Sequence, residues 1–390
     1  MNYDFDHITD RSGTDSLKWN TAPGELPMWV ADMDFPAAPT VLEALQKRLS
    51  NGVLGYSDIP DEWYGAYSSW WTKRHGVNFQ RSHLLFSPGV LPTICTAIQE
   101  LTDAGDNIVV FSPVYNCFYD CITSNRRTVL ECPLTEEDLT YCIDFTLLEQ
   151  QFSLPQTTML LLSNPHNPTG NIWDKDTLAH IGDLARKHNV IVLSDEIHCD
   201  LTDPDICYVP YLSASPQRAE NSIICISPTK TFNLAGIQTS AVVVPDSNLR
   251  RKIRDGLHSR RIDYPNLFAA QAAVAAFTNG GEWLDELRKY LYGNKELVRD
   301  FLISNLPEIK LTPSQATYLL WLDARALKPD PGMTLAQSIR RRTGLYLSEG
   351  TQFGTGGKGF LRMNIACPRS MVRDGLERLA RAVSEMTASE

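Results

Sequence analysis

Seven short apolar runs, separated by helical stretches, limit what this chain can fold into. The runs are Leu84–Ser87, Ile108–Phe111, Thr128–Glu131, Met159–Ser163, Val190–Ser194, Ile223–Ile226 and Ser240–Val244. Most are continuously apolar rather than alternating, which is typical of strands covered on both faces. Helical candidates such as Thr93–Leu101 and Lys175–His188 lie between several of them. The sequence therefore predicts an α/β fold whose mostly parallel, seven-stranded sheet is covered by helices.

The pattern changes in the last third of the chain. It becomes helical from Asn248 through the long stretch Gln271–Leu302, and a smaller α+β region follows. In that region we predict strands at Thr317–Asp323 and Gly359–Ala366, and helices at Leu335–Gly344 and Met371–Met386. A chain of 390 residues is long enough for two domains. We predict a large domain over residues 46–282 and a small domain formed by residues 1–45 and 283–390.

Composition excludes several classes of protein. The formal net charge of -10 argues against a nucleic-acid binder, which usually carries a basic face. The nine cysteines form no C-x-x-C pair and no zinc-type cluster, so we expect free thiols in a reducing cytoplasm. We expect no signal peptide, because the first residues have neither a basic segment nor an apolar core. No apolar run is long enough to span a bilayer.

Polar motifs follow five of the predicted strands. They are Ser87–Val90, Ser112–Tyr115, Asn164–Gly170, Asp195–His198 and the stretch from Ser227 to Gly236. In sheets of this kind, ligands bind beyond the carboxyl ends of the strands. We therefore expect the five motifs to converge on one binding site.

Lys230 has the clearest chemical implication. It lies just beyond a buried strand, and burial lowers the pKa of an ammonium group. A neutral amine can condense with an aldehyde to form a Schiff base. The hydroxyls of Ser227 and Thr229 could bind a phosphate beside it. A lone lysine is more often a surface residue, but the neighbouring motifs reverse that expectation.

Pyridoxal 5'-phosphate needs such a lysine, together with a carboxylate, a hydroxyl donor, a phosphate cradle and a ring platform. Asp195 can pair with the ring nitrogen, and Asn167 can donate to the ring hydroxyl. Gly89 and Val90 precede a helix predicted to begin near Thr93, where backbone N–H groups can hold a phosphate. Tyr115 can stack on the ring. Taken singly, these residues also fit a capping Asp, an Asn in a proline turn and a core aromatic.

Two further residues complete the predicted site. His198 lies three residues after Asp195 and could support that carboxylate or the ring hydroxyl, although a structural histidine is the alternative. Arg362 lies inside an apolar strand, where a buried guanidinium needs a partner. A substrate carboxylate would suit its two-pronged geometry, and an internal salt bridge is the alternative.

These motifs resemble those of the fold-type I pyridoxal-phosphate enzymes, the aspartate aminotransferase superfamily, over essentially the whole chain. Within that superfamily the chain is most similar to the MalY/PatB group of cystathionine β-lyases, or C–S lyases. That similarity rests on Trp29–Phe35, on His198 and on the stretch from Leu361 to Arg369. Thr229 stands where serine is usual before the lysine, and Gln238 stands where aminotransferases often have a phosphate-binding arginine.

The resemblance implies roles for individual residues. Lys230 would be the Schiff-base lysine, Asp195 the partner of the ring nitrogen, and Arg362 the anchor of the substrate carboxylate. Asn167 and Tyr115 would contact both cofactor and substrate. Tyr56, on a glycine-bracketed loop, would reach the phosphate of the neighbouring subunit in a homodimer.

The expected activity is a β-elimination that cleaves L-cystathionine, cystine or a related S-conjugate of L-cysteine to pyruvate, ammonia and a thiol. A same-fold alternative is an aminotransferase for neutral or aromatic amino acids. A second alternative is a non-catalytic regulator that retains the fold. The intact Lys230, Asp195 and Arg362 argue against that regulator, and we expect no metal, nucleic acid or membrane partner.

Overall fold

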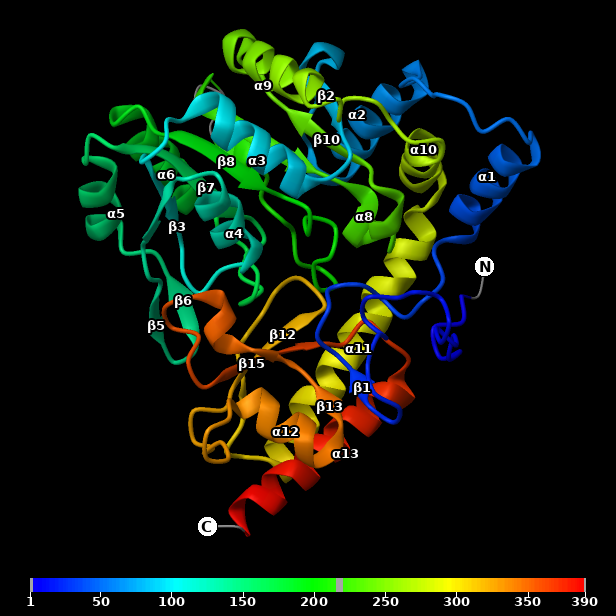
Figure 1. Ribbon diagram of the computed structural model, residues 1–390, viewed down its shortest axis with the longest axis vertical. Coiled ribbons are helices and arrows are strands. Elements are labelled where there is room, and N and C mark those ends of the chain that lie inside the picture. The colour runs from blue at the N-terminus through cyan, green and yellow to red at the C-terminus, as the bar shows by residue number, and fades with distance from the viewer. Residues whose placement is uncertain (1–2, 215–219, 389–390) are drawn as a thin grey trace.

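The computed structural model describes residues 3–214 and 220–388, and a seven-stranded sheet is its largest element (Figure 1). The strand order is β2-β10-β9-β8-β7-β3-β4. The strands are β2 (Leu84–Ser87), β3 (Asn107–Val110), β4 (Thr128–Glu131), β7 (Thr157–Ser163), β8 (Ile191–Asp195), β9 (Ser222–Ile226) and β10 (Ser240–Val243). Only β10 runs antiparallel to its neighbours, β2 and β9. The predicted mostly parallel sheet is therefore confirmed.

Helices bury both faces of this sheet. On β7, Met159 and Leu161 pack with α3 (Val90–Leu101) and α9 (Ser247–Ser259), whereas Leu160 and Leu162 belong to the core on the opposite face. The opposite face carries α2 (Asp61–His75), α5 (Phe145–Phe152), α6 (Lys175–Lys187) and α10 (Ala269–Asn279). Because successive side chains of a strand point to opposite faces, double coverage requires a continuously apolar strand. This is the physical basis of the apolar runs in the sequence.

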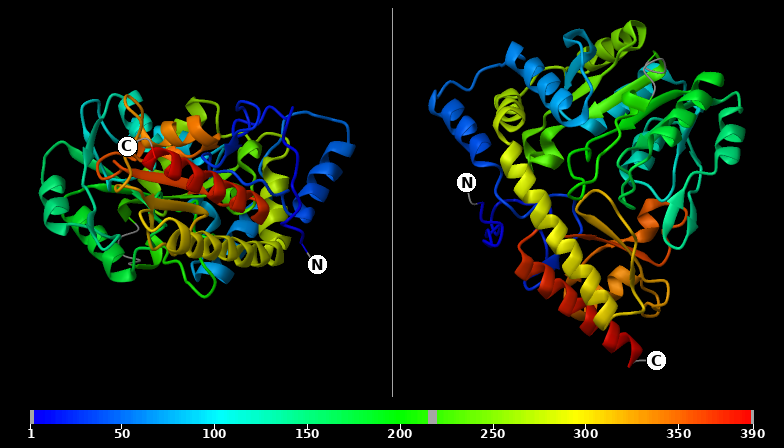
Figure 2. Two further views of the ribbon diagram at one scale, coloured as in Figure 1. Left: turned by 90° about the horizontal axis from the view of Figure 1, so that it is seen from below. Right: turned by 180° about the vertical axis from the view of Figure 1, so that it is seen from behind.

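A second, smaller sheet lies below the first in Figure 1. Its order is β11-β12-β15-β14, and its strands are β11 (Lys310–Leu311), β12 (Leu319–Asp323), β15 (Phe360–Asn364) and β14 (Ser348–Glu349). Helices α12 (Leu335–Thr343) and α13 (Arg369–Thr387) accompany it. The N-terminal segment joins this part, because β1 (Leu26–Pro27) pairs with β13 (Leu345–Tyr346). Figure 2 shows the long helix α11 (Gly281–Asn305) running between the two parts.

Two helix boundaries differ from the prediction. The stretch Gln271–Leu302 is two helices, α10 and α11, which meet at Gly280. A Cβ at Gly280 would lie 2.4 Å from the ring of Phe232 and 2.5 Å from the Ala276 carbonyl oxygen, so only glycine fits this close approach. The predicted start of the third helix near Thr93 was also wrong, because α3 begins at Val90 with Gly89 as its N-cap.

The remaining elements are short. They are α1 (Pro39–Ser50), η1 (Arg81–His83), α4 (Cys117–Ser124), β5 (Thr135–Glu137), β6 (Thr140–Cys142), α7 (Tyr211–Ala214), α8 (Pro228–Thr231), η3 (Ala235–Ile237) and η4 (Gly350–Phe353). Residue 46 lies within α1 and residue 283 within α11, so both proposed domain boundaries fall inside helices, and the division stays a prediction. All nine cysteines are free thiols. No helix in the described ranges is long and apolar enough to cross a membrane.

Candidate active site

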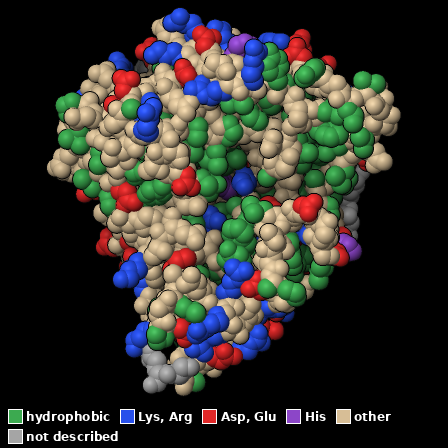
Figure 3. Space-filling view, in the orientation of Figure 1, with side chains coloured by type: hydrophobic (Ala, Val, Ile, Leu, Met, Phe, Trp, Pro, Cys, Tyr) green, Lys and Arg blue, Asp and Glu red, His purple; other side chains and the backbone are tan. Residues whose placement is uncertain are grey.

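A cavity of about 230 Å³ lies at the carboxyl ends of the central strands, and Figure 3 shows this face hollowed between the two parts of the molecule. Eight predicted site residues line it: Gly89, Val90, Tyr115, Asn167, Asp195, His198, Thr229 and Lys230. They come from four separate loops that follow β2, β7, β8 and β9, and from the segment after β3. The structure therefore brings the predicted motifs together at one edge of the sheet.

Lys230 occupies the short helix α8. Ser227 caps this helix by accepting a hydrogen bond from the Thr229 N–H at 3.1 Å, and Pro228 takes the first helical position. The Lys230 Nζ donates to the Ala31 carbonyl oxygen at 2.6 Å. Burial lowers the pKa of Lys230, while the charges of Asp32 and Asp195 act in the opposite direction. A lysine in this setting has readier access to its neutral form than a surface lysine.

Asp195 is a buried carboxylate at the end of β8. It accepts a hydrogen bond from the Ile197 N–H at 3.1 Å. Burial raises its pKa to about 7, although that hydrogen bond and the charge of Lys230 both lower it. No salt-bridge partner contacts it among the described residues. A cation placed in the cavity beside Asp195 would compensate the buried negative charge of this carboxylate.

His198 lies on the turn after Asp195 and also faces the cavity. Burial lowers its pKa to about 3, and the charges of Lys230 and Arg362 lower it further. The ring is therefore neutral at ordinary pH. Its Nδ1 atom is buried and has no hydrogen-bond partner in the part of the chain that is described. A polar ligand group in the cavity could satisfy this atom.

Arg362 projects from β15 of the smaller sheet and is 5% exposed. Its Nη1 donates to Asn167 Oδ1 at 3.2 Å and its Nη2 donates to the Trp29 carbonyl oxygen at 3.0 Å, while the Phe353 ring lies 4.8 Å from its guanidinium carbon. Burial lowers its pKa to about 10, which still leaves it charged. Its Nε has no partner, and no carboxylate pairs with it among the described residues. Arg362 therefore forms no internal salt bridge with the described residues, contrary to the alternative considered above.

The side of the cavity suited to a phosphate combines Gly89 and Val90, at the N-terminus of α3, with the hydroxyl of Thr229. Helix N-termini favour anions because their first N–H groups lack intrahelical acceptors. Ser227 lies beside this wall rather than on it. Its hydroxyl donates to the Thr239 carbonyl oxygen at 2.7 Å and lies 2.8 Å from the Thr229 hydroxyl. Its clearest role is therefore to hold Thr229 and α8 in place.

Three predicted site residues do not line this cavity. Ser227 lies beside its wall, Arg362 contacts Asn167 of the wall, and Tyr56 lies away from it. Tyr56 is on the loop between α1 and α2, and its side chain is fully exposed. Its neighbours Val53 and Leu54 are also exposed, at 66% and 65%. A group of large, exposed apolar side chains is typical of a surface that binds another molecule.

Several cavity residues were missed by the sequence analysis. Ala31, Ser163, Ile197 and Ala235 line the cavity, as do Leu91 and Pro92 of α3. Ala31 belongs to the Trp29–Phe35 motif that carries the resemblance, but an alanine gives no chemical signal. Its contribution is a backbone carbonyl, and backbone contacts cannot be read from residue types.

Comparison with known proteins identifies the family. Residues 27–379 match the family described as "Aminotransferase class I and II". The chain belongs to this aminotransferase family. The chain is 40% identical to the cystathionine β-lyase PatB of Bacillus subtilis, with 97% of this chain and 100% of PatB covered. It is 32% identical to the protein MalY of Escherichia coli, with 98% and 99% covered.

A similar solved structure gives the fold directly. Cystalysin from Treponema denticola, which contains pyridoxal 5'-phosphate, superposes with a TM-score of 0.95 at 34% identity. The match covers 99% of this chain and all of that chain. The predicted fold-type I architecture is therefore confirmed.

Proposed function

We propose that this protein is a pyridoxal-phosphate-dependent C–S β-lyase that cleaves L-cystathionine or a related S-conjugate of L-cysteine to pyruvate, ammonia and a thiol. The observation that carries the proposal is the placement of Lys230 and Asp195 on the wall of one cavity, with Arg362 hydrogen-bonded to Asn167 of that wall. The similarity to PatB over the whole chain supports the same activity.

The residues present fit the cofactor. Within the described ranges, Asp195 is a buried carboxylate without a salt-bridge partner and His198 has a buried Nδ1 without a hydrogen-bond partner, while Lys230 supplies an amine in the same cavity. A protonated pyridine nitrogen would compensate the charge of Asp195. The N-terminus of α3 and Thr229 would hold the phosphate. Tyr115 would cover the ring, with Asn167 on the side of its hydroxyl.

Bound pyridoxal phosphate supplies an aldehyde that condenses with amines and a ring that accepts the electron pair of a broken Cα–H bond. The chain supplies binding and proton transfer. Arg362 would bind the substrate α-carboxylate through its Nη groups and its free Nε. Lys230 Nζ would take the α-proton, because its lowered pKa makes the neutral amine accessible. Asp195 would remain ionised and keep the ring electron-poor.

Elimination is favoured over transamination by the leaving group. A thiol with a pKa near 8.5 leaves the β-carbon far more readily than an alcohol does. Among the described residues, no arginine lines the cavity, and Arg362 adjoins it through Asn167. The cavity wall therefore has no second arginine that could bind a side-chain carboxylate. Dicarboxylic amino acids are therefore not the expected substrates.

The working form would be a cytoplasmic homodimer. The exposed Tyr56, Val53 and Leu54 form an apolar surface that a second subunit would cover, and Tyr56 would then reach the partner's phosphate. Free cysteines throughout the chain suit a reducing compartment.

The decisive assay compares two reactions side by side. Purified protein is given L-cystathionine alone, or an aromatic amino acid together with 2-oxoglutarate. We expect pyruvate, ammonia and a new thiol from the first mixture. Turnover of the second mixture alone would make the protein an aminotransferase and remove the lyase assignment. No turnover of either by the cofactor-loaded protein would instead favour a regulator.

A further inference from the structure

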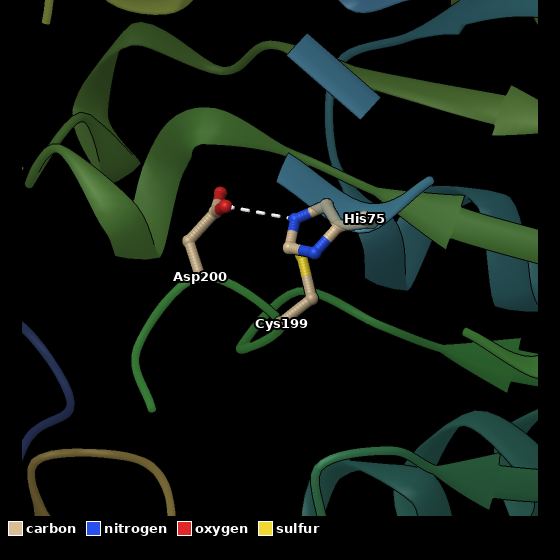
Figure 4. A group of neighbouring side chains, drawn as sticks. All are labelled: His75, Cys199 and Asp200. Atoms are coloured by element: carbon tan, nitrogen blue, oxygen red, sulfur yellow. Dashed lines mark hydrogen bonds and ion pairs between the residues drawn. The ribbon is translucent and has the colours of Figure 1, made fainter. Parts of the chain in front are cut away.

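A buried carboxylate that the proposed reaction does not use lies five positions beyond Asp195. Asp200 is 5% exposed and receives hydrogen bonds from two separate helices. From α2, His75 Nε2 lies 2.9 Å from its Oδ1, and Trp70 Nε1 lies 3.0 and 3.2 Å from its two oxygens. From α8, the Thr231 hydroxyl lies 3.1 Å from its Oδ2. Figure 4 shows the His75 ring directed at this carboxylate.

The same place carries a set of potential metal ligands, because atoms of His75, Cys199 and Asp200 lie within 4.8 Å of one another. The hydrogen bonds argue against a metal. Each oxygen of Asp200 already accepts two of them, so a cation would have to displace donors that are themselves buried. Burial and the nearby acidic groups raise the pKa of the Cys199 thiol well above its ordinary value, so it stays protonated. A neutral thiol is a poor ligand.

The position of Asp200 connects two parts of the site. Through the main chain it belongs to the turn that bears Asp195 and His198. Through Thr231 it holds the residue that follows Lys230, and Thr231 is itself fully buried. Burial by itself raises the pKa of Asp200, but the hydrogen bonds from His75 and Trp70 outweigh it, and the pKa is lowered. An ionised carboxylate only accepts hydrogen bonds, so His75 Nε2 carries the proton.

We propose that Asp200 is a positioning residue that fixes the lysine-bearing helix α8 to the Asp195–His198 turn, with His75 and Trp70 of α2 holding its carboxylate. The proposal rests on the proposed function, since it concerns how Lys230 is placed for proton transfer. Helix α8 has only four residues and cannot set the direction of Lys230 by its own hydrogen bonds. A misplacement of about 1 Å can cost about a hundredfold in rate.

The test uses a near-isosteric change on the holoenzyme. Thr231→Val removes only the hydroxyl, and Thr231→Ser keeps it. Thr96→Val is the matched control, because Thr96 is fully buried and its hydroxyl has no partner among the described residues. For Thr231→Val we expect kcat to fall about tenfold to a hundredfold with KM changed by less than about threefold. Thr231→Ser and Thr96→Val should stay within about threefold of the wild type.

A second readout does not depend on turnover. The visible circular dichroism of the bound cofactor reports how the ring is held by Lys230, and it should weaken in Thr231→Val but not in Thr231→Ser. If the wild type proves to be a transaminase, the lyase assignment fails, while this spectrum and the exchange of the substrate α-proton with deuterium oxide still decide the role of Asp200.

Three results would overturn the proposal. The first is an unchanged kcat and spectrum in Thr231→Val, and the second is an equal loss in Thr231→Val and Thr231→Ser. The third is stoichiometric zinc in the purified wild type, measured by mass spectrometry, that His75→Ala removes. If Thr231→Val does not fold, Trp70→Phe replaces it. This change keeps an aromatic side chain in the buried position but removes the Nε1 donor together with part of the indole. An unchanged kcat in Trp70→Phe would also overturn the proposal.

Discussion

The Nζ atom of Lys230 lies 2.6 Å from the carbonyl oxygen of Ala31, which precedes it by 199 residues. The same oxygen accepts a hydrogen bond from the Tyr318 hydroxyl at 3.1 Å. Three segments therefore meet at this one backbone oxygen: α8 with Lys230, the N-terminal segment with Ala31, and Tyr318, which directly precedes β12. This acceptor holds the Lys230 amine at the cavity.

Replacing Lys230 should remove the covalent attachment of the cofactor and nearly all catalysis. In Lys230→Ala we expect turnover to fall by about 10²- to 10⁴-fold, because the variant lacks the amine that transfers the α-proton. The visible absorption band of the yellow protein, and the shift of that band with pH, should disappear. Lys230→Arg is the control for charge, since a guanidinium cannot become a neutral amine at ordinary pH. Full activity in Lys230→Ala would refute the assignment of Lys230 as the Schiff-base lysine.

Replacing Asp195 should weaken catalysis without unfolding the protein. Loss of a charge-assisted pair at a buried site costs about 2–4 kcal/mol, so we expect Asp195→Asn to lower kcat by about thirtyfold to a thousandfold. Steady-state kinetics at saturating cofactor measures this. A kcat equal to that of the wild type would mean that another group faces the ring nitrogen.

The cofactor-free protein should reveal the raised pKa of Asp195 through its stability. The pKa of this carboxyl is about 7 in the folded protein, against 3.8 for the free group, so between these pH values the folded state keeps a proton that the unfolded chain has released. Stability from this group is therefore lost as the pH rises from about 4 to about 7. His198 has the opposite sign, because its folded pKa of about 3 lies below 6.5.

Comparing the wild type with Asp195→Asn separates the contribution of Asp195 to the pH dependence of stability from the contribution of His198. We expect the cofactor-free variant to be more stable than the cofactor-free wild type at about pH 8, by up to about 4 kcal/mol, and nearly equal to it near pH 4. Urea unfolding at the two pH values measures the difference. A difference that does not change with pH would show that Asp195 is ionised throughout. Bound cofactor should remove the effect, because it compensates the charge.

Replacing Arg362 by lysine should impair substrate binding more than cofactor binding. Lysine keeps the charge but loses the planar, two-pronged geometry that fits a carboxylate. We expect KM for cystathionine to rise about tenfold or more, since a charge-assisted hydrogen bond contributes about 1.5–3 kcal/mol, with the cofactor band unchanged. A KM equal to that of the wild type would mean that another residue binds the substrate α-carboxylate.

Tyr56 can be tested by mixing two defective proteins. Tyr56→Phe should raise the dissociation constant of the cofactor. When Tyr56→Ala and Lys230→Ala subunits are unfolded together and refolded, each mixed dimer has one site with both residues intact if Tyr56 acts across the interface. Random pairing then restores about a quarter of wild-type activity. No gain over the separate variants, or a fully active monomer, would refute a shared site.

Much of the fold could be predicted from local pattern. Continuous apolar runs indicated the doubly covered strands, and the polar motifs after them indicated the edge that bears the site. The break at Gly280 was missed, and the close approach of the Phe232 ring that requires glycine there is a contact that local pattern does not contain.

The sequence by itself determined the chemistry available: an amine at Lys230, a carboxylate at Asp195 and a guanidinium at Arg362, each in a strand or just after one. Only the tertiary structure decided their environments. Packing buried Asp195 without a cation, left Arg362 Nε free and directed Lys230 to the carbonyl of Ala31. It also turned Ser227 inward and placed Asp200 between α2 and α8. These outcomes depend on distances between residues far apart in the chain, and residue types alone do not fix such distances.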